Sequence, residues 1–198
     1  MSFPPGRACK VASEGIDAAP VGEPSAQALW PTTTYFSPTK ELFFNDEAIQ
    51  LVHVPAGHSD GDSLVFFRRS DVLATGTLFD LTGYPVIDRQ HGGSIDGLIA
   101  GLNRILELAI PGGWQEGGTV VVPARGRLCD EADVVEYRDM ITIIRDRVRD
   151  LIGRGASLED VLAARPTREY DGRYGATSGE WTTAQFVEAV YRSLERPR

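Results

Sequence analysis

The sequence has 198 residues, of which 42% are hydrophobic and 24% charged, a composition typical of a globular protein rather than a fibrous or disordered one. Its net charge of −8 argues against non-specific binding to nucleic acid, which depends on Lys and Arg side chains that meet phosphates. No apolar stretch approaches the roughly 20 residues of a membrane-spanning helix, so we expect neither nucleic acid nor a membrane as a partner.

The first 29 residues differ in composition from the rest. Pro, Gly, Ala and Ser are common there and no hydrophobic period is sustained, which predicts an irregular segment 1–29 ahead of a folded domain 30–198. The opening MSFPPGRACK lacks the apolar middle of a secretory signal, so we expect a cytoplasmic location. Cys9 and Cys129 fit no metal-ligand or redox spacing and are interpreted as reduced thiols.

Strand patterns come first in the folded domain. The stretch ELFFNDEAIQLVHV predicts two short strands around a turn at Asn45-Asp46. SLVFFRRSDVLATGTLF predicts a second pair of strands, with Arg68 to Asp71 as the polar turn. GGTVVVPA is a short run of β-branched residues, typical of a buried strand.

Helical patterns follow. From Ser94, which can cap a helix, SIDGLIAGLNRILELA places its apolar residues three and four apart. A longer amphipathic helix is predicted in DEADVVEYRDMITIIRDRVRDLIGRG, a short one before Pro166, and a last one at Thr182, which has capping-box spacing to Gln185. This order of elements predicts an α/β or α+β layered domain with helices packed on a mostly antiparallel sheet.

Several motifs, in order, resemble those of metallo-β-lactamase-fold hydrolases. HVPAGHSDGDSLVFFRRSDVLATGTLFD is similar to the middle of such proteins, where a His-Thr-Asp-Gly-Asp-Ser stretch, a strand and Thr-Gly-Asp follow one another. GYPVIDRQHGGSIDGLIAGLNRIL resembles the loop and helix that come next, and VVVPARGRLCDEADVVEYRDM resembles the Pro-Gly-His-Gly turn and its helix. The likeness runs from about Trp30 to Arg196. It implies a metallo-β-lactamase-like sheet with packed helices, and we expect the N-terminal half of the αββα sandwich to be missing.

The resemblance implies zinc, but most ligands are absent. The family binds one or two zinc ions through an early His-x-His-x-Asp-His motif, then a His, an Asp and a final His, and the metal activates a water. Here the early motif is absent, and His58 stands at the only ligand position that survives. Thr77 replaces the bridging Asp, and Arg125, which has no lone pair to donate, replaces the final His. We therefore expect no resident cofactor, or zinc if the chain is a hydrolase after all.

The remaining polar residues of this region have alternative interpretations. Asp60 and Asp62 either orient a metal ligand or, as we favour, satisfy backbone donors in a tight turn. Arg125 is either a solvated surface side chain or a cation placed where a metal would sit, bonded to Asp62 or Asp80. The aromatic residues of the C-terminal part form either a lid over the cleft or, as we favour, a cover for an edge of the sheet; they are Tyr170, Tyr174 and Trp181.

Three functional hypotheses follow. The first is a superfamily member that has lost zinc-dependent hydrolysis and acts as a binding or assembly module, with binding residues Thr77, Ser94 and Arg125. Because half of the fold would leave one sheet face uncovered, this hypothesis predicts a homodimer or a protein partner, and it allows a small-molecule ligand.

The second hypothesis is an active zinc hydrolase that another chain or segment completes, with His58 as a metal ligand. The third is a metal-independent acid–base enzyme, similar to an isomerase or cyclase, that uses the cleft in which the family binds its metal. Its catalytic residues would be Asp62, Tyr84 and Asp88.

Overall fold

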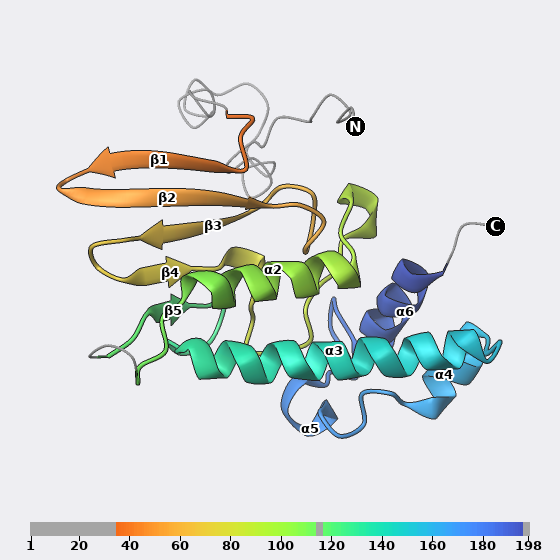
Figure 1. Cartoon of the computed structure of the whole chain (residues 1–198). Coiled ribbons are helices and arrows are strands. Elements are labelled where there is room, and N and C mark those ends of the chain that lie inside the picture. The colour runs from red at the N-terminus through yellow and green to blue at the C-terminus, as the bar shows by residue number, and fades with distance from the viewer. Residues whose placement is uncertain (1–34, 114–116, 196–198) are drawn as a thin grey trace, which may run out of the picture.

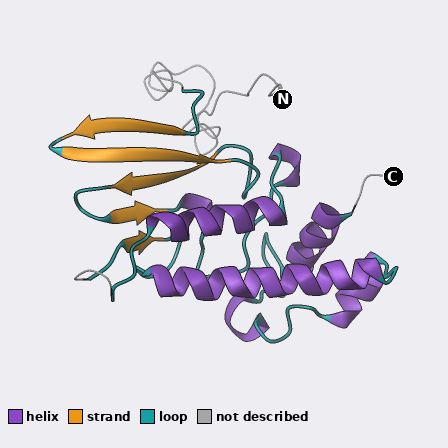
Figure 2. Ribbon diagram, in the orientation of Figure 1, coloured by secondary structure: helices purple, strands orange, loops and turns teal. Residues whose placement is uncertain are grey.

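The computed structural model describes residues 35–113 and 117–195. A five-stranded sheet forms one side of the molecule, and helices pack against one of its faces and extend past its end (Figures 1 and 2). This mixed architecture confirms the predicted class of helices layered on a sheet. The segment 1–29 and Cys9 lie outside the described residues, whereas Cys129 is a free, buried thiol.

The sheet has the strand order of the sequence. Its strands are β1 (Thr39–Phe44), β2 (Glu47–Val54), β3 (Asp62–Phe67), β4 (Val72–Ala74) and β5 (Val120–Val122). The first three pairs are antiparallel, which confirms both predicted hairpins, and β4 pairs with β5 in parallel. Asn45, Asp46 and Asp71 adopt positive φ angles in the hairpin turns, a conformation that Asn and Asp tolerate better than most residues.

One predicted strand is shorter than expected. The pattern of VLATGTLF suggested a strand that continues to Phe79, but β4 ends at Ala74 and residues Gly76–Leu78 form the 3-10 helix η1. Gly76 has a φ of 55°, which turns the chain out of the extended conformation. The strand therefore ends early because the glycine directs the chain toward the helices.

The four predicted helices are confirmed. They are α2 (Ile95–Leu108), α3 (Glu131–Gly153), α4 (Leu158–Ala164) and α6 (Thr183–Leu194). Ser94 caps α2 by accepting a hydrogen bond from the Gly97 N–H, and Thr182 and Gln185 form the expected capping box. Two short elements, η2 (Arg89–His91) and α5 (Asp171–Tyr174), are too short to leave a hydrophobic period in the sequence.

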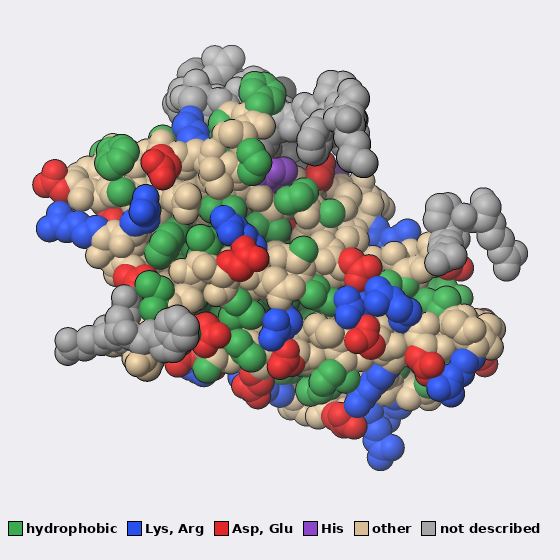
Figure 3. Space-filling view, viewed as in Figure 1, with side chains coloured by type: hydrophobic (Ala, Val, Ile, Leu, Met, Phe, Trp, Pro, Cys, Tyr) green, Lys and Arg blue, Asp and Glu red, His purple; other side chains and the backbone are tan. Residues whose placement is uncertain are grey.

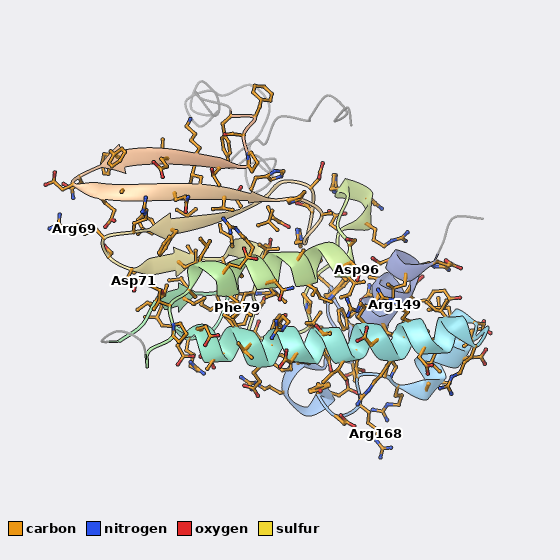
Figure 4. The ribbon with its side chains drawn as sticks, viewed as in Figure 1. Arg69, Asp71, Phe79, Asp96, Arg149 and Arg168 are labelled. Carbon is orange, nitrogen blue, oxygen red and sulfur yellow. The ribbon has the colours of Figure 1, made fainter. Side chains whose placement is uncertain are left out.

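The core lies between the helices and the inner face of the sheet, whose buried apolar residues are Val52, Val54, Leu64, Leu73 and Val121. Buried residues of α2 and α3, such as Leu102 and Ile141, join the same cluster. In the first turn of α2, Asp96 pairs with Arg149 of α3, as Figure 4 shows, and this contact helps to fix the two helices side by side. No helix within the described ranges combines the length and apolar composition that crossing a bilayer demands.

The opposite face of the sheet carries mostly apolar residues as well. The strand registers place 14 residues on this outer face: Lys40, Leu42, Phe44, Glu47, Ile49, Leu51, His53, Ser63, Val65, Phe67, Val72, Ala74, Val120 and Val122. Tyr35 packs on it against Leu51, with Ile49 and Val65 beside them. Leu51 is buried, and the other thirteen are half-buried or exposed in the described structure. Strands that are apolar on both sides are typical of a sheet covered on both faces.

Candidate functional site

The loop that contains His58 follows β2 and lies against the start of α2. The carbonyl oxygen of Ala56 accepts hydrogen bonds from the backbone N–H and the hydroxyl of Ser94, and that of His58 accepts from the Asp88 N–H. Gly93 and Gly97 allow this approach, because a Cβ atom on either would overlap the backbone of the loop. Ser94, predicted as a binding residue, therefore has two structural roles: it caps α2 and it holds the loop.

Asp62 is the centre of a small hydrogen-bond cluster at the end of this loop. Its carboxylate accepts from the backbone N–H of Ser59 at 2.9 Å and from the hydroxyl of Thr77 at 3.2 Å. The Nδ1 atom of His58 lies 3.8 Å from the same carboxylate. These contacts confirm that Asp62 satisfies a backbone donor in a tight turn. Asp60, by contrast, is exposed and uses its backbone carbonyl to accept from His53.

Arg125 forms an ion pair with Asp80. Its Nε and Nη2 atoms each lie 2.8 Å from Oδ2 of Asp80, and Oδ1 of Asp80 accepts from the backbone N–H and hydroxyl of Thr82. The Asp80 side chain is 10% exposed and that of Arg125 70% exposed. The hypothesis that Arg125 bonds a carboxylate at this position is confirmed, with Asp80 as the partner.

The backbone explains why these two residues meet. The Ala124 N–H donates to the Phe79 carbonyl, and the Leu81 N–H donates to the Arg125 carbonyl. The segments after β4 and after β5 therefore run side by side, as an extension of the parallel pairing of those strands. Within the described ranges, no hydrogen bond or ion pair joins the Arg125–Asp80 pair to the Asp62 cluster. The structure thus divides the predicted site into two separate clusters.

The residues present do not fit a zinc ion. Zinc in proteins takes three or four Cys, His, Asp or Glu ligands. Across residues 35–113 and 117–195, no group of three or more such side chains could hold a metal ion. His58 and Asp62 are only a pair, and the Asp62 oxygens already accept from Ser59 and Thr77. Asp80 faces a guanidinium, which repels a dication.

The proposed acid–base residues are tied to structural partners. The hydroxyl of Tyr84 lies within hydrogen-bond distance of Asp171 and of the Thr167 carbonyl, and its ring stacks on Phe186. Burial, with the carboxylate of Asp171 nearby, raises the pKa of Tyr84 well above its usual value, so the phenol stays protonated at neutral pH.

Asp88 caps the 3-10 helix η2. Burial opposes its ionisation, but hydrogen bonds from the His91 ring and from the backbone N–H groups of Gln90 and His91 outweigh this effect and lower the pKa of Asp88. A carboxylate with a lowered pKa is a poor general acid. The catalytic roles of Asp62, Tyr84 and Asp88 stay predictions, and the geometry gives each of them a structural role.

A cavity of about 460 Å³ opens beside Arg125. Its wall includes the aromatic residues Tyr84, Tyr174 and Trp181, together with Glu180 from the loop before α6. The Trp181 indole N–H is buried without a hydrogen-bond partner among the described residues. Tyr174 packs against Tyr84 and against Tyr137 of α3, so the aromatic residues lie at a cleft rather than at an edge of the sheet. Sequence reasoning missed Glu180, because nothing in its local pattern links it to Arg125.

Comparison with known proteins identifies the fold of the chain. No protein-family model and no curated protein sequence matches the chain. The metallo-beta-lactamase family protein TTHA1429 from Thermus thermophilus is 14% identical, with a TM-score of 0.54 over 80% of this chain and 46% of that one. The sec-alkylsulfatase Pisa1 from a Pseudomonas species is 13% identical, with a TM-score of 0.53 over 80% of this chain and 26% of that one.

This chain therefore spans between a quarter and a half of the length of those two structures. At 13% and 14% identity the likeness concerns the fold alone. The sheet, the helices α2 and α3, and the order in which they follow one another agree with the resemblance that the sequence motifs indicated. The described part of this protein has a metallo-β-lactamase fold.

Proposed function

We propose that this chain is a metal-independent binding module, in which the Arg125–Asp80 ion pair takes the place of a metal centre. The observation that carries the proposal is that pair: a permanently cationic group bonds the carboxylate that stands at the candidate site. An ion pair with a 70% exposed arginine contributes only about 0–1 kcal/mol to stability. Its effect on function is therefore chemical, because it neutralises Asp80 and excludes a dication.

The cavity beside Arg125 is where the module would bind its ligand. Asp80 engages Nε and Nη2 of the guanidinium, and no described residue accepts a hydrogen bond from Nη1. The free edge of the guanidinium suits a carboxylate, which can accept two parallel hydrogen bonds from it. The aromatic wall suits an apolar or aromatic body. Because Glu180 lines the same cavity, a ligand with a single negative charge is favoured over a dianion.

The proposal predicts that a small aromatic carboxylate binds this cavity through Arg125. Phenylacetate, titrated into the full chain by isothermal calorimetry, should bind, and Arg125→Gln should weaken it about tenfold, the equivalent of about 1.4 kcal/mol. The matched control is Arg104→Gln, which removes the same charge from an exposed ion pair with Glu107. A wild-type chain that does not bind phenylacetate, or equal weakening by both substitutions, would contradict the proposed site.

The zinc hydrolase hypothesis remains the second candidate function, because His58 and Asp62 do lie within 3.8 Å of each other. It requires further ligands from another chain or segment, and it predicts stoichiometric zinc. The metal content of the purified chain therefore separates a zinc hydrolase from the metal-independent module.

A further inference from the structure

The outer face of the sheet is a mostly apolar surface, on which Tyr35 packs against Leu51. Ten of its 14 residues are apolar, and Lys40 and Glu47 carry its two permanent charges, which are opposite in sign. The opposite side of the molecule differs, since Figure 3 shows acidic and basic side chains interspersed over the helices α2 and α3. Within this face, Phe44 is 75% exposed and lines a shallow groove with Ile49 and Phe67.

The size of this face is that of an interaction site. At about 3.3 Å per residue and about 4.8 Å between strands, the five strands cover roughly 400 Å² in projection. That area lies within the range of about 300–600 Å² of the largest apolar patch on a typical monomeric protein, and such patches are often functional. Two such faces packed against each other, with the exposed side chains at their rim, approach the area of a small specific interface.

We propose that the outer face is the interface of a homodimer, in which the sheets of two copies of this chain pack face to face. The charge distribution supports a second copy as the occupant. The chain carries a net charge of −8, so two copies repel each other over most of their surface. The outer face carries one acidic and one basic residue, Glu47 and Lys40, so its permanent charges cancel. Repulsion between copies is therefore least where apolar area is greatest.

Symmetry is compatible with this arrangement. A two-fold axis brings the same patch of each copy together, so a face whose residues are mostly apolar is complementary to itself. Sheets that pack face to face keep their side chains interdigitated at a separation of about 10 Å. The proposal goes beyond the binding module above, and it does not depend on what Arg125 binds.

Two neighbouring phenylalanines provide a matched test. Phe44 lies on the outer face and Phe43 on the other side of the same strand, and they are 75% and 80% exposed. Sedimentation equilibrium of the full chain, over roughly a hundredfold range of concentration, should show twice the 21.6 kDa of one chain. Phe44→Lys should raise the dissociation constant at least about tenfold, and Phe43→Lys should leave it unchanged.

Each other outcome overturns the proposal. A wild-type chain that stays monomeric at the highest concentration shows that the face is covered from within the chain or needs no cover. A dimer that survives Phe44→Lys uses another surface. Equal loss with both variants indicates pairing of the β1 edges instead of packing of the faces. Leu42→Lys, also on the outer face, repeats the measurement if Phe44→Lys alters the circular dichroism spectrum.

Discussion

Replacing Gly97 by alanine is expected to lower the free energy of unfolding by about 3 kcal/mol, at the upper end of the usual cost of overpacking. A Cβ atom at this position would overlap the carbonyl group of Ala56, which belongs to the backbone and cannot rotate away. The Ser94 hydroxyl, which caps α2 and bonds the same carbonyl, lies in the same crowded place. The substitution therefore separates α2 from the loop that carries His58.

Gly153 provides the control for this prediction. It is also a helical glycine, in the last turn of α3, and an added Cβ would meet nothing within 4 Å. Gly153→Ala should raise stability by up to about 1 kcal/mol, because alanine favours helix more than glycine does. Urea unfolding followed by circular dichroism measures both variants. If Gly97→Ala were as stable as the wild type, the close seating of the loop on α2 would be wrong.

Replacing Asp62 by alanine is expected to cost about 2 to 3 kcal/mol of stability. The carboxylate accepts from the backbone N–H of Ser59, a residue that is 4% exposed, and no water can replace that acceptor easily. A buried donor left without a partner costs about 1–3 kcal/mol. The Thr77 hydroxyl also loses its acceptor, but Thr77 is exposed and can bond water instead.

Asp60 is the matched control, two residues away in the same turn. Its side chain is exposed, and the bond it contributes to His53 comes from the backbone carbonyl, which alanine retains. Asp60→Ala should change the free energy of unfolding by less than about 0.5 kcal/mol, as is usual for surface positions. Thermal unfolding of the two variants compares them directly. Equal losses of stability in both variants would show that the negative charge of the turn, and not the hydrogen bond from Ser59, stabilises it.

Much of the fold could be predicted from local patterns. The Asn45-Asp46 turn, the Ser94 cap and the Thr182–Gln185 capping box depend on neighbouring residues, so the sequence shows them directly. The end of β4 at Ala74 was missed because a glycine in a strand-like run is compatible with both a strand and a turn. The helix α5 was missed because its four residues make about one helical turn, which is too short for a hydrophobic period to appear.

The candidate site was predicted only in part. Residue types left two alternatives for Arg125, a solvated surface side chain or a cation bonded to Asp62 or Asp80. They could not tell Asp80 from Asp62, because that choice depends on how the segments after β4 and β5 run together. A cleft with an aromatic lid was one of the alternatives, and Tyr174 and Trp181 do line the cavity, but its full lining was not predicted. Its lining comes from segments up to about 100 residues apart in sequence, between Thr82 and Thr183, which only the tertiary packing brings together.

Metal content tests the central claim most directly. The full chain, expressed in zinc-supplemented medium and dialysed against zinc-free buffer, should retain less than about a tenth of a zinc ion per chain by mass spectrometry, because the described residues offer too few ligands. About one zinc per chain, lost on His58→Ala, would contradict the account, because it would show that a metal centre forms at the loop that carries His58.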